Sequence, residues 1–198
     1  MSARESHGFV SRGGVKLAHA LDTFGLDPSG LVCADFGCNV GGFTDCLLQR
    51  GAAHVHTIDT GYGELAWKLR NDDRVTVMER TNALHAEPLE RGRPSLIVVD
   101  MGWTAQRSCL PAARNWLDDP TTGRIVTLIK PHYEAKRLGI EHRGILDDAD
   151  ADEVNAKVLE EIGSMGFRVL DWTRSPIRGG KGKGKAGNIE FLALVAPA

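Results

Sequence analysis

The chain of 198 residues has no apolar run approaching the roughly 20 residues that a membrane-spanning helix needs. Its first residues, MSARESHGF, lack the apolar core of a secretory signal peptide. The four cysteines form no C-x-x-C pair and no zinc spacing, and the seven histidines show no spacing typical of metal ligands. These absences predict a cytoplasmic protein, not a membrane protein, without a bound metal.

An excess of positive charge is also lacking, because the formal net charge is −2 at pH 7. The chain therefore has no general attraction to nucleic acid, and any such binding must come from local basic clusters. One cluster near the start contains Arg4, Arg12 and Lys16. The cluster near the end contains Arg174, Arg178, Lys181, Lys183 and Lys185. On charge count alone, a solvated face and a mobile loop explain these residues more simply than an RNA site does.

Apolar segments alternate with helical patterns along most of the chain. Strands are expected at residues 31–36, 54–59, 75–79, 95–100, 124–130, 167–172 and 189–195. Helices are expected between residues 11 and 25, from residue 42, and at 64–70, 105–117 and 151–165. The β-branched runs are continuous, as in strands that a helix-covered parallel sheet buries on both faces.

The predicted architecture is one α/β domain at residues 13–198, preceded by an arm at residues 1–12. We expect a mostly parallel seven-stranded sheet with helices on both faces. The last two strands have no helix between them and should form an antiparallel hairpin. Residues 131–152 show no clear period and are expected to form a long loop beyond the carboxyl end of a strand.

The central feature of the sequence is residues 31–44, LVCADFGCNVGGFT, which combine a buried strand, a glycine-rich turn and the start of a helix. In open α/β sheets the ligand binds beyond the carboxyl ends of the strands, where glycines let the backbone approach it. The second strand ends in Asp59, in the position of an acid that binds ribose hydroxyls. Gly37 and Gly41 lack the G-x-G-x-x-G spacing, and Asp35 would repel a pyrophosphate. The same carboxylate suits the amino and sulfonium groups of S-adenosylmethionine, so the pattern favours this cofactor over a dinucleotide or a turn that binds nothing.

Charged residues lie at the ends of otherwise apolar strands. Asp100 ends SLIVVD, Lys130 ends RIVTLIK, and Glu190 lies at the start of IEFLALV. Lys16 lies on the helix before the first strand. Each residue alone is typical of a solvated strand end. Together they belong to elements whose ends should converge beside the glycine turn, which indicates a catalytic site.

Several blocks of the sequence resemble the TlyA (hemolysin A) proteins of the FtsJ-like methyltransferase family. They are SRGGVKL at 11–17, GGFTDCLLQRGA at 41–52, GYGELAWKLR at 61–70, ERTNA at 79–83, IKP at 129–131, SPI at 175–177 and NIEFL at 188–192. The similarity extends over residues 11–195. It implies a Rossmann-like class I methyltransferase fold with S-adenosylmethionine as the cofactor. It also implies methylation of ribose 2′-hydroxyls in RNA, with ribosomal RNA as the leading substrate class.

By the same resemblance, a catalytic tetrad falls on Lys16, Asp100, Lys130 and Glu190. Lys130 would hold the ribose hydroxyl and accept or steer its proton. As a base it would need a lowered pKa, which burial or the nearby charge of Lys16 would provide. Asp100 and Glu190 would orient the lysines, and Asp100 would also lie nearest the transferred methyl group.

The predicted cofactor site combines residues from the ends of several strands. The candidates are Asp35, Gly37, Cys38, Gly41, Gly42, Phe43 and Thr44 around the methionine part, Asp59 at the ribose, Thr81 and Asn82 near the adenine, and Asp100. Two of them have simpler alternatives. Cys38 would serve as a small residue that fills the turn, and Phe43 as a core residue.

Among the features that differ from the TlyA pattern, two concern RNA binding. The chain begins almost directly at the SRGG block, so we do not expect the small N-terminal RNA-binding domain of those proteins, and either the basic clusters or a separate RNA-binding partner protein would select the substrate. After Asp100, the segment containing Trp103 departs from the family pattern, and this tryptophan would either stack on a target base or lie buried at a helix start. The RNA-binding candidates are Arg12, Trp103, Arg178, Lys181, Lys183 and Lys185.

Two other functions are alternatives. The chain would methylate a small hydroxylated metabolite, or it would bind RNA or the cofactor without catalysis. The first alternative predicts activity on nucleosides or small molecules without salt-dependent RNA binding. The intact tetrad argues against the second, because a non-catalytic protein has no need of four charges at strand ends.

Overall fold

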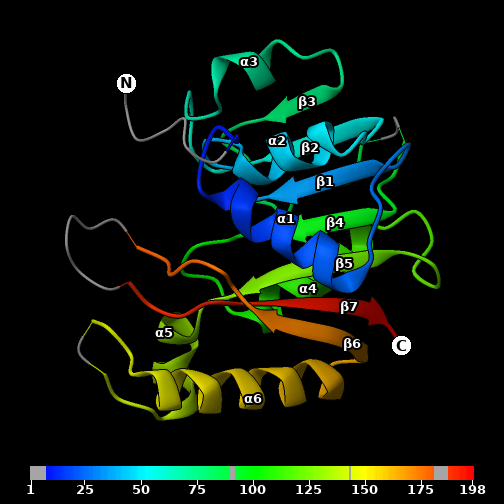
Figure 1. Ribbon diagram of the computed structural model, residues 1–198. Helices are drawn as coiled ribbons and strands as arrows, with labels where there is room; N and C mark the ends of the chain where they lie inside the picture. The colour runs from blue at the N-terminus through cyan, green and yellow to red at the C-terminus, as the bar shows by residue number, and fades with distance from the viewer. Residues whose placement is uncertain (1–7, 90–91, 143, 181–186) are drawn as a thin grey trace, which may run out of the picture.

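The computed structural model describes residues 8–89, 92–142, 144–180 and 187–198. In these residues one seven-stranded sheet has the strand order β3-β2-β1-β4-β5-β7-β6 (Figure 1). Its parallel part consists of β1 (Val32–Phe36), β2 (His54–Ile58), β3 (Val75–Met78), β4 (Leu96–Val99) and β5 (Arg124–Ile129). Its antiparallel part is β7 (Phe191–Pro197), which pairs with both β5 and β6 (Phe167–Arg174). The predicted α/β fold with a C-terminal antiparallel hairpin is confirmed.

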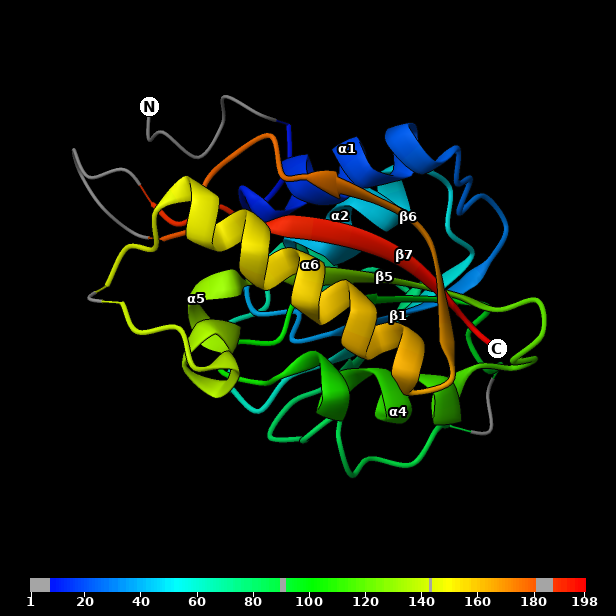
Figure 2. The ribbon, with the colours of Figure 1, turned by 90° about the horizontal axis from the view of Figure 1, so that it is seen from below.

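Helices cover both faces of the sheet (Figure 2). One face carries α1 (Gly13–Phe24) and α2 (Gly42–Gln49), and the other carries α4 (Gln106–Trp116) and α6 (Asp148–Ser164). Successive strand residues point to opposite faces, so Cys33 belongs to the core under α1 and α2, whereas Ala34 belongs to the core under α4 and α6. Both faces of the central strands are therefore buried, which explains their continuous apolar runs. No helix in the described part of the chain is both long and apolar enough to cross a bilayer.

Short helices occupy part of the segment that the sequence pattern predicts as a long loop. It begins with α5 (Pro131–Glu134) and the 3-10 helix η1 (Ala135–Leu138), and α6 starts at Asp148 rather than at residue 151. Pro131 begins α5 because its fixed φ angle suits the first position of a helix. Elements of four residues are too short to show a hydrophobic period, so the pattern misses them. The helix expected at 64–70 is also shorter, since only α3 (Trp67–Arg70) forms.

Candidate active site

The glycine-rich turn lies where the ends of β1, β2 and β4 meet. Gly37 directly follows β1, and its amide donates a 2.8 Å hydrogen bond to the carbonyl of Ile58 at the end of β2. Its φ is +81°, and a Cβ atom there would lie 2.6 Å from the backbone carbonyl oxygen of Asp100. Only glycine combines this backbone conformation with so close an approach. The turn ends at Gly41, the N-cap of α2, so the start of this helix faces the same edge of the sheet.

Asp35 is a fully buried carboxyl group beside this turn. Its Oδ2 atom accepts hydrogen bonds from the amide of Thr44 at 2.9 Å and from the Thr44 hydroxyl at 2.7 Å. Its Oδ1 atom has no hydrogen-bond partner among the described residues. Burial, together with the negative charges of Asp100 and Asp59, raises the pKa of Asp35 to about 7, although its bonds to Thr44 oppose the shift. A buried carboxyl group with one free oxygen fits a ligand that carries a cationic group.

Asp59, the residue expected at the ribose, is tied to the same turn. Its Oδ2 atom accepts a 2.8 Å hydrogen bond from the amide of Asn39, and its Oδ1 atom accepts a 2.7 Å bond from the amide of Gly61. Thr81 lies beside it, because the Thr81 amide donates a 2.9 Å bond to the Asp59 carbonyl. Asn82 follows and is exposed. The candidates after β1, β2 and β3 thus share one edge of the sheet, while their contacts with a cofactor stay predictions.

Cys38 and Phe43 are both buried in this region. Burial, helped by the charges of Asp35 and Asp59, raises the pKa of the Cys38 thiol, which makes the thiol unreactive. Phe43 belongs to the apolar core under α1 and α2. Their positions match the simpler alternatives of a small turn residue and a core residue.

The four predicted catalytic residues form two ion pairs at the carboxyl edge of the sheet. Lys16 of α1 pairs with Glu190, which directly precedes Phe191 of β7. Lys130, which follows β5, places its Nζ atom 2.5 Å from Oδ1 of Asp100, which follows β4. Both pairs are mostly buried, and the Asp100 side chain, at 25% exposed, is the most accessible of the four.

The pKa of Lys130 is shifted in the direction opposite to the expected one. Burial lowers the pKa of its ammonium group, but the charge of Asp100, a hydrogen bond to Asp100 and the charge of Glu190 raise this pKa above its usual value. The expected lowering is wrong because the nearest charges are carboxylates and Lys16 is itself paired with Glu190. At neutral pH, Lys130 is therefore a charged hydrogen-bond donor rather than a ready base.

Trp103 lies on the loop between Asp100 and α4 and is 85% exposed, so the alternative of a buried helix-start tryptophan is wrong. Its ring packs on that of Tyr133, with a centroid distance of 4.6 Å and an interplanar angle of 33°. Tyr133 also contacts the ring of His132, and the Lys130 Nζ atom lies 6.0 Å from the Tyr133 centroid. An exposed aromatic surface therefore adjoins the Lys130–Asp100 pair. No motif or period in the sequence marks Tyr133 or His132.

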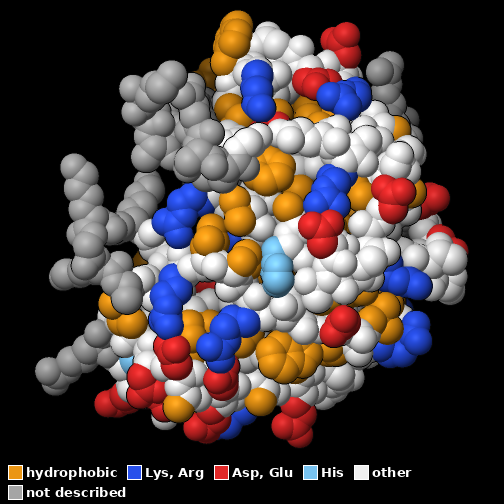
Figure 3. All heavy atoms as spheres, in the orientation of Figure 1, with side chains coloured by type: hydrophobic (Ala, Val, Ile, Leu, Met, Phe, Trp, Pro, Cys, Tyr) orange, Lys and Arg blue, Asp and Glu red, His pale blue; other side chains and the backbone are white. Residues whose placement is uncertain are grey.

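The two described arginines among the RNA-binding candidates lie side by side. Arg12 donates a 2.6 Å hydrogen bond to the backbone carbonyl of Arg178, and the Arg178 guanidinium pairs with Asp148 at 2.9 Å. Arg174 pairs with Asp152 at 2.6 Å. Figure 3 shows basic side chains gathered beside acidic ones over the start of α6, so part of the positive charge here is already balanced. The candidates Lys181, Lys183 and Lys185, and also Arg4, lie outside the described residues.

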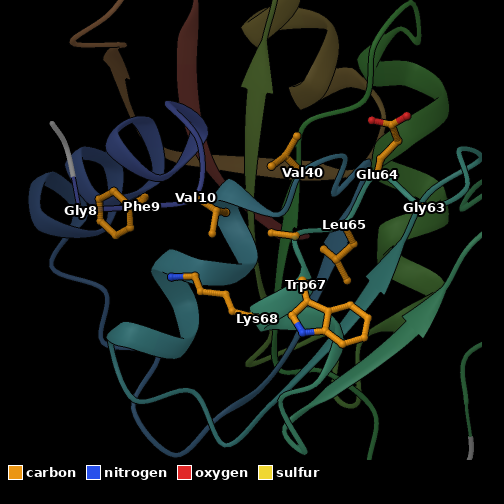
Figure 4. Close-up of a pocket in the computed structure, with 10 residues that line it drawn as sticks. Gly8, Phe9, Val10, Val40, Gly63, Glu64, Leu65, Trp67 and Lys68 are labelled. Atoms are coloured by element: carbon orange, nitrogen blue, oxygen red, sulfur yellow. The ribbon is translucent and has the colours of Figure 1, made fainter. Parts of the chain in front are cut away.

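An open groove of about 800 Å³ borders the turn (Figure 4). It is lined by Gly8, Phe9, Val10, Val40, Gly63, Glu64, Leu65, Ala66, Trp67 and Lys68. None of the four paired residues above lines it, so we place the chemistry at the ion pairs and not in the groove. Across the described residues, no three His, Cys, Asp or Glu side chains gather in a way that would hold a metal ion.

Residues 9–192 match the model of the FtsJ-like methyltransferase family. The chain is 40% identical over 190 residues to "Putative rRNA methyltransferase YqxC" of Bacillus subtilis, covering 93% of this chain and 64% of that protein. It is 38% identical over 187 residues to "16S/23S rRNA (cytidine-2'-O)-methyltransferase TlyA" of Mycobacterium tuberculosis, covering 93% of this chain and 67% of that protein. The solved structure "Putative hemolysin from Streptococcus thermophilus" superimposes with a TM-score of 0.87 at 40% identity, covering 98% of this chain and 68% of the other. The chain thus spans 64% of the length of the Bacillus relative.

Proposed function

This chain belongs to the FtsJ-like methyltransferase family, and from this premise we propose that it methylates a ribose 2′-hydroxyl of ribosomal RNA, with S-adenosylmethionine as the methyl donor. The observation that carries the proposal is the Lys130–Asp100 pair beside the glycine turn and the buried Asp35. The Mycobacterium relative is named a cytidine-2′-O-methyltransferase, which supports ribose as the site of methylation.

The residues of the turn fit the proposed cofactor. Asp35 has a buried carboxylate oxygen without a partner among the described residues, which suits the cationic methionine part. Gly37 lets the turn pass close to the Asp100 carbonyl at the end of β4, and Asp59 is the proposed partner of the ribose hydroxyls. Thr81 and Asn82 are proposed near the adenine. When bound, S-adenosylmethionine supplies a methyl group that its sulfonium makes electrophilic.

The tetrad then has to orient the acceptor oxygen and remove one proton. In our proposal the Lys130 ammonium donates a hydrogen bond to the ribose O2′ atom and holds it in line with the methyl group. A ribose hydroxyl is a very weak acid, but its proton becomes strongly acidic once the oxygen gains the methyl group. A carboxylate is then a sufficient acceptor, and Asp100, held against Lys130 at 2.5 Å, is the proposed one. Glu190 would fix Lys16 beside this pair.

The proposed function is tested by incubating the purified protein with labelled S-adenosylmethionine and unmodified ribosomal subunits, the RNA extracted from them, or free nucleosides. We expect label on RNA that maps to a ribose 2′-oxygen. Label on nucleosides alone would instead identify a small-molecule methyltransferase. Transfer to RNA only after addition of a cell fraction would show that a separate RNA-binding partner selects the substrate. Cofactor binding without any transfer would contradict the proposal.

Trp103 is proposed to stack on a base of the RNA substrate. We expect Trp103→Ala to raise the KM for RNA by about 5- to 150-fold, because stacking of a base on an aromatic side chain contributes about 1–3 kcal/mol. The fold should tolerate the change, since the side chain is 85% exposed.

The measurement is a steady-state titration with RNA at saturating cofactor, beside a thermal unfolding curve. Trp67→Ala is the matched control, because Trp67 is 76% exposed and lines the groove (Figure 4), to which no tetrad residue contributes. An equal rise in KM for both variants, or for neither, would contradict a specific role for Trp103.

A further inference from the structure

Glu134, the last residue of α5, is a buried carboxylate next to the proposed acceptor site. Its Oε1 atom accepts a 2.9 Å hydrogen bond from the amide of Gln106, the first residue of α4. Its Oε2 atom accepts bonds from Nε and Nη2 of Arg137, at 3.1 and 3.0 Å. Arg137 also pairs with Glu161 of α6. One carboxylate thus joins the start of α4 to the segment after β5.

The bond to Gln106 replaces a cap that α4 does not make for itself. The N-cap residue of α4 is Ala105, which has no side chain able to accept from the first helical amides. The unpaired amides and the helix dipole make this end favourable for a negative charge. Glu134 supplies that charge from a segment 28 residues away in the chain.

Gln106 extends the same connection into the sheet. Its side-chain amide donates a 3.1 Å bond to the carbonyl of Leu128, and its side-chain oxygen accepts a 2.6 Å bond from the hydroxyl of Thr127. Both partners belong to β5, whose end carries Lys130. The start of α4 is therefore attached on two sides, to β5 through Gln106 and to α5 through Glu134.

The two segments that Glu134 joins carry the acceptor site between them. The loop at 101–105 follows Asp100 and holds Trp103, and the segment at 130–133 holds Lys130 and Tyr133. The Trp103–Tyr133 contact has one member on each segment, and the Lys130–Asp100 ion pair joins Lys130 to the residue directly before the loop. A shift of one segment against the other would separate both pairs at once.

We propose that Glu134 is a positioning residue for the RNA side of the active site, a role that rests on the proposed function. It does not touch substrate or cofactor. It holds the loop at 101–105 and the segment at 130–133 in register, so that Lys130 and Trp103 meet the acceptor nucleotide in the required geometry. The hydrogen bonds of the cofactor turn go to the ends of β1 and β2 and to α2, and they involve neither Glu134 nor Gln106.

The test compares Glu134→Ala with Glu161→Gln. We expect Glu134→Ala to lower kcat for RNA methylation by about 100-fold, the effect of a misplacement of about 1 Å at a reacting centre. Its affinity for S-adenosylhomocysteine, measured by calorimetry, should stay within about twofold of the wild type. Glu161→Gln removes the other carboxylate partner of Arg137 but leaves the Glu134–Gln106 bond, so we expect a kcat within about twofold of the wild type.

Hydrogen exchange gives a second readout that needs no activity. The Gln106 amide should exchange faster in Glu134→Ala than in the wild type or in Glu161→Gln, because its acceptor is gone. If Glu134→Ala does not fold, Glu134→Gln replaces it: its side-chain oxygen still accepts from Gln106, so it should retain kcat within about tenfold.

A folded Glu134→Ala protein with wild-type kcat would overturn the inference. A loss of cofactor affinity as large as the loss of kcat would overturn it as well. Loss of activity in Glu134→Gln equal to that in Glu134→Ala would overturn it too. Absence of transfer by the wild-type protein would instead reject the proposed function, while the exchange of the Gln106 amide would still report on the connection.

Discussion

Replacement of Lys130 by alanine is expected to lower methyl transfer to RNA by about 1,000-fold or more, while cofactor binding stays nearly unchanged. The reason is that Lys130 is the charged donor proposed to hold the ribose oxygen in line with the methyl group. Its pKa is raised by Asp100 and Glu190 although burial opposes the shift, so the donor is charged throughout the neutral range. The residues proposed to bind the methyl donor at the glycine turn are left intact by the substitution.

The measurement is single-turnover transfer of labelled methyl groups, with cofactor affinity determined separately by calorimetry. Lys157→Ala is the matched control, since Lys157 also pairs with a carboxylate, Glu153 at 2.7 Å, but lies on the exposed side of α6. We expect this control to transfer at the wild-type rate. If Lys130→Ala retains more than about a tenth of the wild-type rate, the assignment of Lys130 is wrong.

Asp35→Asn is expected to weaken cofactor binding by about 10- to 100-fold at pH 8 without destabilising the free protein. Asparagine has the shape of aspartate, and its carbonyl oxygen would keep both bonds from Thr44. Its amide would replace the free Oδ1 atom and would meet a cationic ligand with the wrong polarity. The affinity for S-adenosylmethionine is measured by calorimetry, and stability by thermal unfolding.

The sign of the stability effect follows from the pKa of Asp35, which burial raises from 3.8 to about 7. The folded protein binds this proton more tightly than the unfolded chain, so the free energy of unfolding falls as the pH rises from about 4 to about 7. Above pH 7 the full cost of the buried charge is present in the wild type and absent in Asp35→Asn. At pH 8 the variant should therefore have a Tm equal to or above that of the wild type.

The same pKa makes cofactor affinity depend on pH. Below about pH 7 the Asp35 proton must leave before a cationic ligand binds, so affinity should weaken by about tenfold between pH 8 and pH 6. In Asp35→Asn this dependence should vanish. Asp45→Asn is the control: Asp45 is also buried, but it binds the Val10 amide at 2.8 Å and Lys68 at 2.9 Å, so its replacement should cost stability and spare affinity. A wild-type cofactor affinity that does not change between pH 6 and pH 8 would contradict the role of Asp35.

The sequence by itself determined the features that depend on local patterns. Continuous apolar runs predicted a sheet buried on both faces. Successive residues of a strand point to opposite faces, so an unbroken apolar run means that both faces are buried. The residues from Asp35 to Gly42 and the acid at Asp59 predicted a ligand turn, because backbone conformation and chain spacing are local properties. The resemblance to the TlyA proteins then indicated which charged strand ends form the tetrad.

Only the tertiary structure decided how those residues act on one another. Asp100 and Lys130 are brought together by the parallel pairing of β4 and β5, and this contact raises the pKa that the sequence argument expected to be lowered. The exposure of Trp103 and its contact with Tyr133 likewise depend on a loop and the short helix α5, which meet only in the fold. A pKa or a ring contact is set by neighbours in space, and the register and crossovers of the sheet choose those neighbours. No period or spacing along the chain records that choice.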